Sequence, residues 1–153
     1  MSRKGPALLD VNLLVALFDA DHVHHELAHD WFADNRAGGW ATCPLTENGL
    51  VRVLCNPKYG SPEHAVPAVV DRLRRFRASG HHQFWADEVS LTDTALFRPS
   101  FARGHRQVTD LYLLGLAHRK GGRLVSFDRS IPLGAVSGAV RATLEVIGPV
   151  DED

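Results

Sequence analysis

Short β-prone runs of apolar residues alternate with helical patterns along this chain, and this alternation restricts the fold more than any other feature. The expected strands cover residues 7–9, 40–43, 82–86, 124–127 and 144–147. The expected helices, which carry apolar residues at helical spacing, cover residues 13–18, 24–35, 44–55, 61–79 and 106–118. Strands that alternate with helices are typical of a parallel sheet with right-handed crossovers. We therefore expect a three-layer α/β/α fold around a parallel central sheet, with residues 144–147 as an edge strand.

The length of the chain points to one domain. Its 153 residues fall within the range of about 100 to 200 residues that one domain usually occupies. Hydrophobic residues make up 44% and charged residues 23%, a globular balance that excludes extensive disorder. No repeat or flexible linker divides the sequence. We expect a single domain over residues 1–153, with a core from about 7 to 147 and loose ends at 1–5 and 149–153.

Charge and cysteine content limit the partners and the compartment. The formal net charge of −1 excludes a strongly basic nucleic-acid binder, so a nucleic-acid partner would need a local basic patch. The two cysteines, Cys43 and Cys55, are not spaced as a zinc or redox motif, which favours a reducing compartment. Acids and Asn12 interrupt the apolar run at residues 7–20, and no run approaches the roughly 20 residues of a membrane span. We expect a cytoplasmic protein without membrane contact.

Four acids stand where a carboxylate requires an explanation. Asp10 and Asp128 follow expected strands, at the sheet edge where parallel α/β folds bind ligands. Glu47 and Asp110 lie within apolar helical patterns, where a carboxylate is costly unless something compensates for its charge. Taken singly, each acid has an ordinary alternative as a helix cap, a turn residue or half of a salt bridge. If the four converge, a divalent cation keeps them ionised, and oxygen-only ligands favour Mg²⁺ or Mn²⁺, which suits phosphodiester hydrolysis.

The segments around these acids resemble a known family. Residues 8–14, 46–49, 108–117 and 124–129 look like the four acidic motifs of PIN-domain ribonucleases, in the same order and with similar separations. Within that family, the chain is similar to the VapC-type toxins of bacterial toxin–antitoxin modules. The resemblance covers about residues 7–147, which is most of the chain.

This resemblance implies a site, a cofactor and partners. It makes the four acids an acidic catalytic pocket that hydrolyses RNA, with Asp10 and Asp110 as the first candidates for Mg²⁺ or Mn²⁺ ligands and Asp128 as a third. Supporting hydrogen bonds would come from three polar side chains: Asn12, Thr109 and Ser126. The resemblance also implies a VapB-type antitoxin that occupies the acidic groove, and a homodimer. A non-catalytic RNA-binding or protein-binding PIN module remains an alternative.

A rival motif suggests a compact zinc peptidase. The run His25-Glu26-Leu27-Ala28-His29 matches H-E-x-x-H, in which two histidines bind zinc and the glutamate is the general base. On a helical wheel, however, Leu27, Ala28 and two aromatic residues form the apolar face, and both histidines point away from it. We therefore interpret the motif as a solvated helix face.

Two other groups of residues have both a structural and a functional interpretation. Four arginines between Arg72 and Arg77 form the densest basic run, which suits either a solvated helix face or contact with RNA phosphates. Three tryptophans, Trp31, Trp40 and Trp85, lie in or beside apolar patterns, which favours core packing over base stacking.

Overall fold

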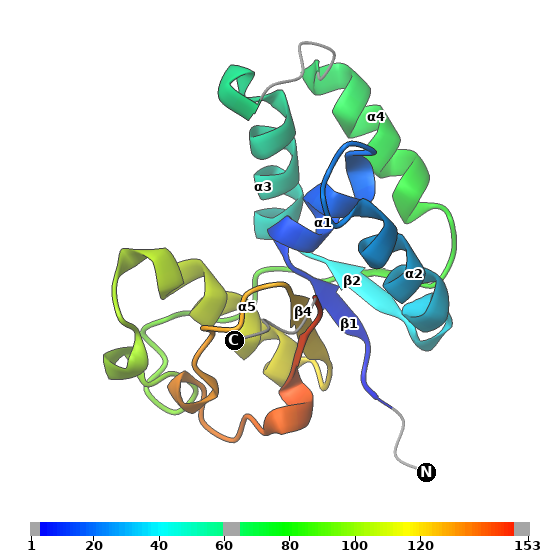
Figure 1. Cartoon of the computed structure of the whole chain (residues 1–153). Coiled ribbons are helices and arrows are strands. Elements are labelled where there is room, and N and C mark those ends of the chain that lie inside the picture. The colour runs from blue at the N-terminus through cyan, green and yellow to red at the C-terminus, as the bar shows by residue number, and fades with distance from the viewer. Residues whose placement is uncertain (1–3, 60–64, 149–153) are drawn as a thin grey trace, which may run out of the picture.

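The computed structural model describes residues 4–59 and 65–148, which form a five-stranded sheet with helices on both faces (Figure 1). Its strands are parallel in the order β3-β2-β1-β4-β5. Their bounds are β1 Ala7–Leu9, β2 Trp40–Thr42, β3 His82–Phe84, β4 Arg123–Ser126 and β5 Leu144–Val146. All five strands expected from the sequence are confirmed, although β3 ends two residues early. The edge position of β5 is confirmed as well.

Five α-helices connect and cover these strands in the part of the chain that the structure describes. They are α1 Val11–Phe18, α2 His25–Asn35, α3 Pro44–Cys55, α4 Val66–Arg77 and α5 Val108–Arg119. Each corresponds to an expected helix. The expected start of α4 at Ser61 lies outside the described residues, and α4 is seen from Val66 onward, with a proline in its first turn.

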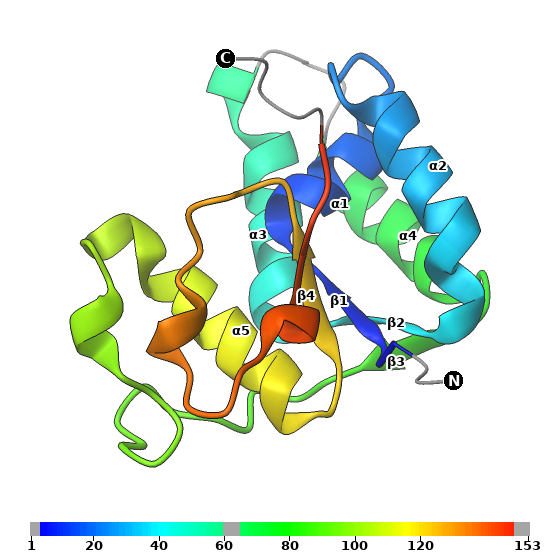
Figure 2. The same cartoon turned by 60° about the horizontal axis from the view of Figure 1, so that its bottom comes forward.

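Side-chain alternation along β1 divides the interior into two cores. Ala7 and Leu9 pack with α1 to α4, whereas Leu8 between them packs with α5 on the opposite face. The neighbouring strand β4 behaves in the same way, with Val125 in the first core and Leu124 in the second. Figure 2 shows the resulting layers, with α5 separated from α1 to α4 by the sheet. The three-layer α/β/α fold is confirmed.

Strand β1 is central, and its neighbours determine which residues meet at its end. It pairs with β2 through Leu8 and Ala41 and with β4 through Leu9 and Val125. Because all three strands are parallel, the residues that follow them lie at the same edge of the sheet. Asp10 comes directly after β1, and Asp128 comes two residues after β4. This topology brings the acids together.

The described part of the N-terminal segment is held by a contact. The carbonyl of Gly5 accepts a hydrogen bond from the Arg123 guanidinium, so the expectation of a loose segment through Gly5 is wrong at that residue. Residues 1–3 and the expected loose tail at 149–153 lie outside the described residues. None of the helices formed by residues 4–59 and 65–148 is long and apolar enough to cross a membrane.

Candidate active site

Asp10 is the most firmly held acid of the four. It is the N-cap of α1, where its Oδ1 accepts a hydrogen bond from the backbone N–H of Val11 at 2.7 Å. Its Oδ2 accepts a second hydrogen bond from the Ser126 hydroxyl, also at 2.7 Å. The residue is only 6% exposed. Strand end, helix start and hydroxyl together give the carboxylate a single orientation.

Ser126 links the acids that follow β1 and β4. This buried hydroxyl donates to Asp10 and accepts from the Asn12 amide at 3.1 Å and from the backbone N–H of Asp128 at 3.0 Å. The Asp128 carboxylate in turn accepts from the backbone and the hydroxyl of Ser130, at 2.8 and 2.6 Å. Ser126 thus contacts Asp10, Asn12 and Asp128, and the supporting roles of Asn12 and Ser126 stay predictions.

The supporting role expected of Thr109 is not matched by a hydrogen bond to the acids. Thr109 is exposed in the first turn of α5, and within residues 4–59 and 65–148 its side chain makes no hydrogen bond to any of the four acids. Its role stays a prediction.

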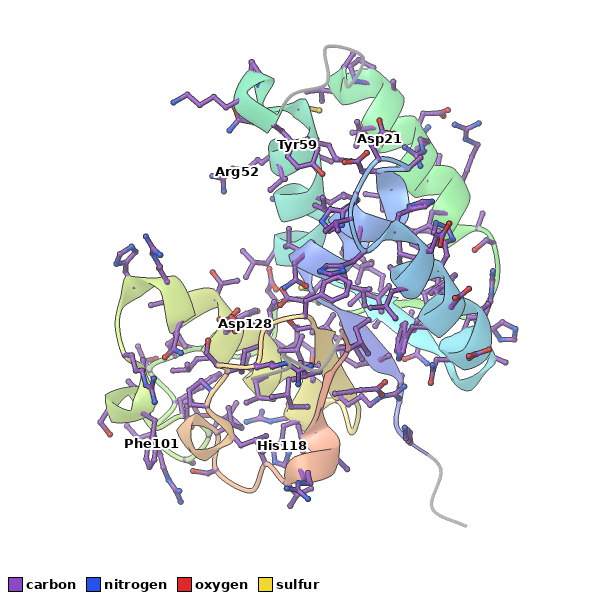
Figure 3. All side chains as sticks on the ribbon, in the orientation of Figure 1. Asp21, Arg52, Tyr59, Phe101, His118 and Asp128 are labelled. Atoms are coloured by element: carbon purple, nitrogen blue, oxygen red, sulfur yellow. The ribbon has the colours of Figure 1, made fainter. Side chains whose placement is uncertain are left out.

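Asp110 completes a group of three interacting carboxylates. Asp110 lies in the first turn of α5. Asp128, labelled in Figure 3, lies near this helix. Burial, the negative charges of Asp10 and Asp128, and a hydrogen bond with Asp128 raise the pKa of Asp110 to about 6. Burial also raises the pKa of Asp10 against the hydrogen bonds from Ser126 and Val11. The folded protein thus holds these carboxylates so close together that their ionised forms repel one another unless a cation is present.

Glu47 reaches this edge of the sheet from α3. Pro44 lies in the first turn of that helix, and Gly49 lets it approach α1, since a Cβ at Gly49 would lie 2.6 Å from Cγ2 of Val11. This close packing places the middle of α3 against the start of α1, where Asp10 lies. The carboxylate of Glu47, however, is bound by Thr42 and Arg77. Its Oε2 accepts a hydrogen bond from the Thr42 hydroxyl at 2.6 Å and is 3.3 Å from Nη1 of Arg77.

Three residues at the site were not identified from the sequence: Thr42, Arg77 and His82. The Thr42 hydroxyl lies 2.7 Å from Nε2 of His82, and burial together with the positive charge of Arg77 lowers the pKa of His82 to about 4. Because Thr42 donates its only hydroxyl proton to Glu47, the neutral His82 must donate from Nε2. Arg77 belongs to the basic run, but its 30-residue separation from Glu47 gave no signal of their pairing.

The donor chemistry of the three clustered acids fits a hard divalent cation. Oxygen is the ligand atom that Mg²⁺ and Mn²⁺ prefer, and a cation offsets both the burial and the carboxylate repulsion that raise the pKa of Asp110 to about 6. Within the described ranges, no three His, Cys, Asp or Glu side chains are arranged closely enough to enclose a metal ion by themselves. Mg²⁺ commonly takes only a few carboxylates and completes its shell with water and substrate oxygens.

The two histidines of the H-E-x-x-H motif pack against α1. Nδ1 of His25 lies 2.7 Å from the carbonyl oxygen of Ala16, and Nε2 of His29 lies 2.9 Å from that of Leu17. Carbonyls in the last turn of a helix have no partner within that helix, so each imidazole satisfies one of them. Leu27, expected on the apolar face, is 38% exposed. The expected orientation of α2 is therefore wrong at these positions, and the geometry favours a structural role over a zinc site.

The basic run and the tryptophans have separate outcomes. Arg74 and Arg75 pair with Asp71 on the exposed surface of α4, as expected of a solvated face, while Arg77 turns toward Glu47. The fourth arginine, Arg72, lies over the ring of Phe18. Core packing is confirmed for the three tryptophans, which are all buried: Trp31, Trp40 and Trp85.

The fold and this acidic edge correspond to a known family. The family model described as "PIN domain" matches residues 7–135, which include Asp10, Glu47, Asp110 and Asp128. The chain therefore belongs to the PIN-domain family.

Curated relatives narrow this assignment. The chain is 45% identical over 141 residues to Ribonuclease VapC44 of Mycobacterium tuberculosis (strain ATCC 25618 / H37Rv), with 92% of this chain and 99% of the relative covered. It is 49% identical over 125 residues to Ribonuclease VapC38 of the same strain, covering 82% and 86%. It is 40% identical over 134 residues to Ribonuclease VapC39, covering 88% and 96%. Within the PIN-domain family, the chain groups with VapC ribonucleases.

Proposed function

We propose that the protein is a metal-dependent endoribonuclease and the toxin of a VapBC-type toxin–antitoxin module. The observation that carries this proposal is the convergence of Asp10, Asp110 and Asp128 at the carboxyl edge of the sheet, where burial and the charges of Asp10 and Asp128 raise the pKa of Asp110 to about 6. The similarity to VapC ribonucleases over most of the chain supports the same function. Glu47 is the fourth catalytic acid of the proposal.

Asp10, Asp110 and Asp128 would hold Mg²⁺ or Mn²⁺, which supplies an activated water and stabilises the charge that develops on the phosphate. The chain's own residues prepare this site. Ser126 and the N–H of Val11 fix both oxygens of Asp10, and Ser130 fixes Asp128. Asn12 and Ser126 are proposed as supporting groups.

The partners and the setting follow from the proposed class. The RNA substrate would enter at the acidic edge, and a VapB-type antitoxin would neutralise the toxin by covering the same edge. We also propose a homodimer of single PIN domains in the cytoplasm, where bacterial RNA is found.

The test is cleavage of total cellular RNA by purified, antitoxin-free protein with Mg²⁺ or with EDTA. We expect discrete fragments that disappear with EDTA and with Asp10→Ala, but persist with His25→Ala, which alters only the contact between α2 and α1. Cleavage that survives Asp10→Ala and is lost with His25→Ala would overturn the carboxylate site in favour of the zinc motif. Absence of cleavage by folded, metal-loaded protein on every RNA class would favour a non-catalytic binding module.

A further inference from the structure

A cleft of about 550 Å³ opens beside Glu47. Its walls are Glu47 and His82 together with one face of α4 that includes Val70, Leu73 and Arg77. A cleft of this size falls in the range of small-ligand sites. Its position next to a proposed catalytic acid makes it a place where part of the substrate can lie.

The polar groups of this cleft are fixed in a chain that ends at Arg77. Nε2 of His82 contacts the Thr42 hydroxyl at 2.7 Å, Thr42 donates to Glu47 at 2.6 Å, and Nη1 of Arg77 lies 3.3 Å from the same Glu47 oxygen. Both contacts of Arg77 with Glu47 use Nη1. Among the described residues, no hydrogen bond is found for its Nε or Nη2. The guanidinium, whose side chain is 38% exposed, is therefore held in place with donors left for an anion.

An exposed aromatic ring lies directly against this guanidinium. The Cζ atom of Arg77 is 4.8 Å from the ring centroid of Phe84, which is 46% exposed. Phe84 is the last residue of β3, the outer strand of the sheet beside β2 (Figure 2). An exposed ring beside a fixed cation is the combination with which proteins bind single-stranded nucleic acid: the ring stacks on a base and the cation contacts the phosphate.

We propose that this cleft, together with the Phe84 ring that lies against its lining residue Arg77, binds one nucleotide of single-stranded RNA adjacent to the bond that is cleaved. The inference rests on the ribonuclease function proposed above. Phe84 stacks on the base, the free donors of Arg77 bind the phosphate, and the Glu47 ion pair keeps Arg77 in position. The formal charge of the chain is −1, so its overall charge does not attract RNA and binding depends on a local cation such as Arg77.

The test measures binding of a fluorescein-labelled 12-nucleotide single-stranded RNA by anisotropy, in an Asp10→Ala background that keeps the RNA intact. We expect Phe84→Ala to weaken binding about 5- to 20-fold, in line with loss of one stacked base. We expect Arg77→Gln to weaken it similarly and to reduce the slope of log K against log salt by about 0.7, the value of one phosphate contact on a single strand. Phe84→Ala should leave that slope unchanged, and Arg77→Lys should restore it.

The matched control is Phe101→Ala, which removes a ring of similar exposure, 50%, on a 3-10 turn at the other end of the molecule (Figure 3). Equal affinity of Phe84→Ala and Phe101→Ala for RNA would overturn the proposal. So would loss of affinity for an acidic decapeptide, but not for RNA, in Arg77→Gln, because the cleft would then be a peptide site. If wild-type protein cleaves RNA while both cleft variants bind it normally, the subsite is wrong and the ribonuclease stands. If the parent neither binds nor cleaves RNA, the proposed function fails and the subsite fails with it.

Discussion

Replacing Asp110 by Asn should stabilise the metal-free protein at neutral pH while abolishing cleavage. The pKa of Asp110 is raised from 3.8 to about 6 by burial and by the charges of Asp10 and Asp128. A group with a raised pKa in the folded state favours folding below its unfolded pKa, and that contribution is lost as the pH rises through about 6. The shift corresponds to at most about 3 kcal/mol. Because Asp110 is only half-buried, solvent screening reduces this to about 1 kcal/mol.

The assay is urea unfolding in EDTA at several pH values, read as the difference in unfolding free energy between Asp110→Asn and wild type. This difference cancels the titration of other groups. We expect it to be near zero at pH 4, where Asp110 is protonated, and to reach about 1 kcal/mol in favour of Asn at pH 7.5. Asp30→Asn, at an exposed position on α2, is the control and should show no such trend.

Two outcomes would refute this reasoning. One is a difference that does not change with pH. The other is an Asn variant that is less stable than wild type at pH 7.5. Addition of Mg²⁺ at pH 7.5 provides a second readout, since a ligand that binds the folded state stabilises it. Mg²⁺ should raise the Tm of wild type more than that of Asp110→Asn.

Three further predictions follow from the contacts of the site. Ser126→Ala leaves the Asn12 amide and the N–H of Asp128 without their shared acceptor. It should lower the free energy of unfolding in urea by about 1 to 3 kcal/mol and remove most of the cleavage activity. Ser126→Thr, which keeps the hydroxyl, should retain cleavage, and equal activity of the two variants would contradict this. Burial and the charge of Arg77 lower the pKa of His82 to about 4, so the contribution of His82 to stability is complete above pH 6.5 and is lost as the pH falls toward 4. His82→Gln should reduce this loss of unfolding free energy at low pH by about 1 kcal/mol, after the same reduction for screening. An unchanged pH dependence of stability below pH 6.5 would disprove it. His25→Ala should lower the free energy of unfolding by about 1 kcal/mol, because it removes the hydrogen bond to the carbonyl of Ala16, while cleavage stays within twofold of wild type; a large loss of cleavage would reveal a catalytic role.

The order of strands and helices was predictable from the sequence because each element carries its own periodic pattern. The buried β1 strand is short and fully apolar, and α5 has apolar residues along most of its length. The same patterns identified the acids, since Asp10 and Asp128 directly follow the apolar runs expected to be strands and Asp110 lies within an apolar helical pattern.

Contacts between distant segments were not predictable, because no local pattern encodes them. The pairing of Arg77 with Glu47 depends on how α4 packs against α3, and nothing in either segment specifies it. The orientation of α2 was predicted wrongly at Leu27 and the two histidines because a helical wheel assumes that the most apolar stripe is buried. In the folded protein, the unpaired carbonyls at the end of α1 attract the imidazoles instead.

The central claim is that Asp10, Asp110 and Asp128 direct water against an RNA phosphodiester. The most direct test is the chemistry of the product ends, determined by end-labelling after cleavage by wild-type protein with Mg²⁺, beside Asp110→Asn. Because the proposed nucleophile is water and not the ribose 2′ oxygen, we expect a 5′ phosphate and a 3′ hydroxyl, and no product from the variant. A 2′,3′-cyclic phosphate, or the same products from Asp110→Asn, would contradict the account.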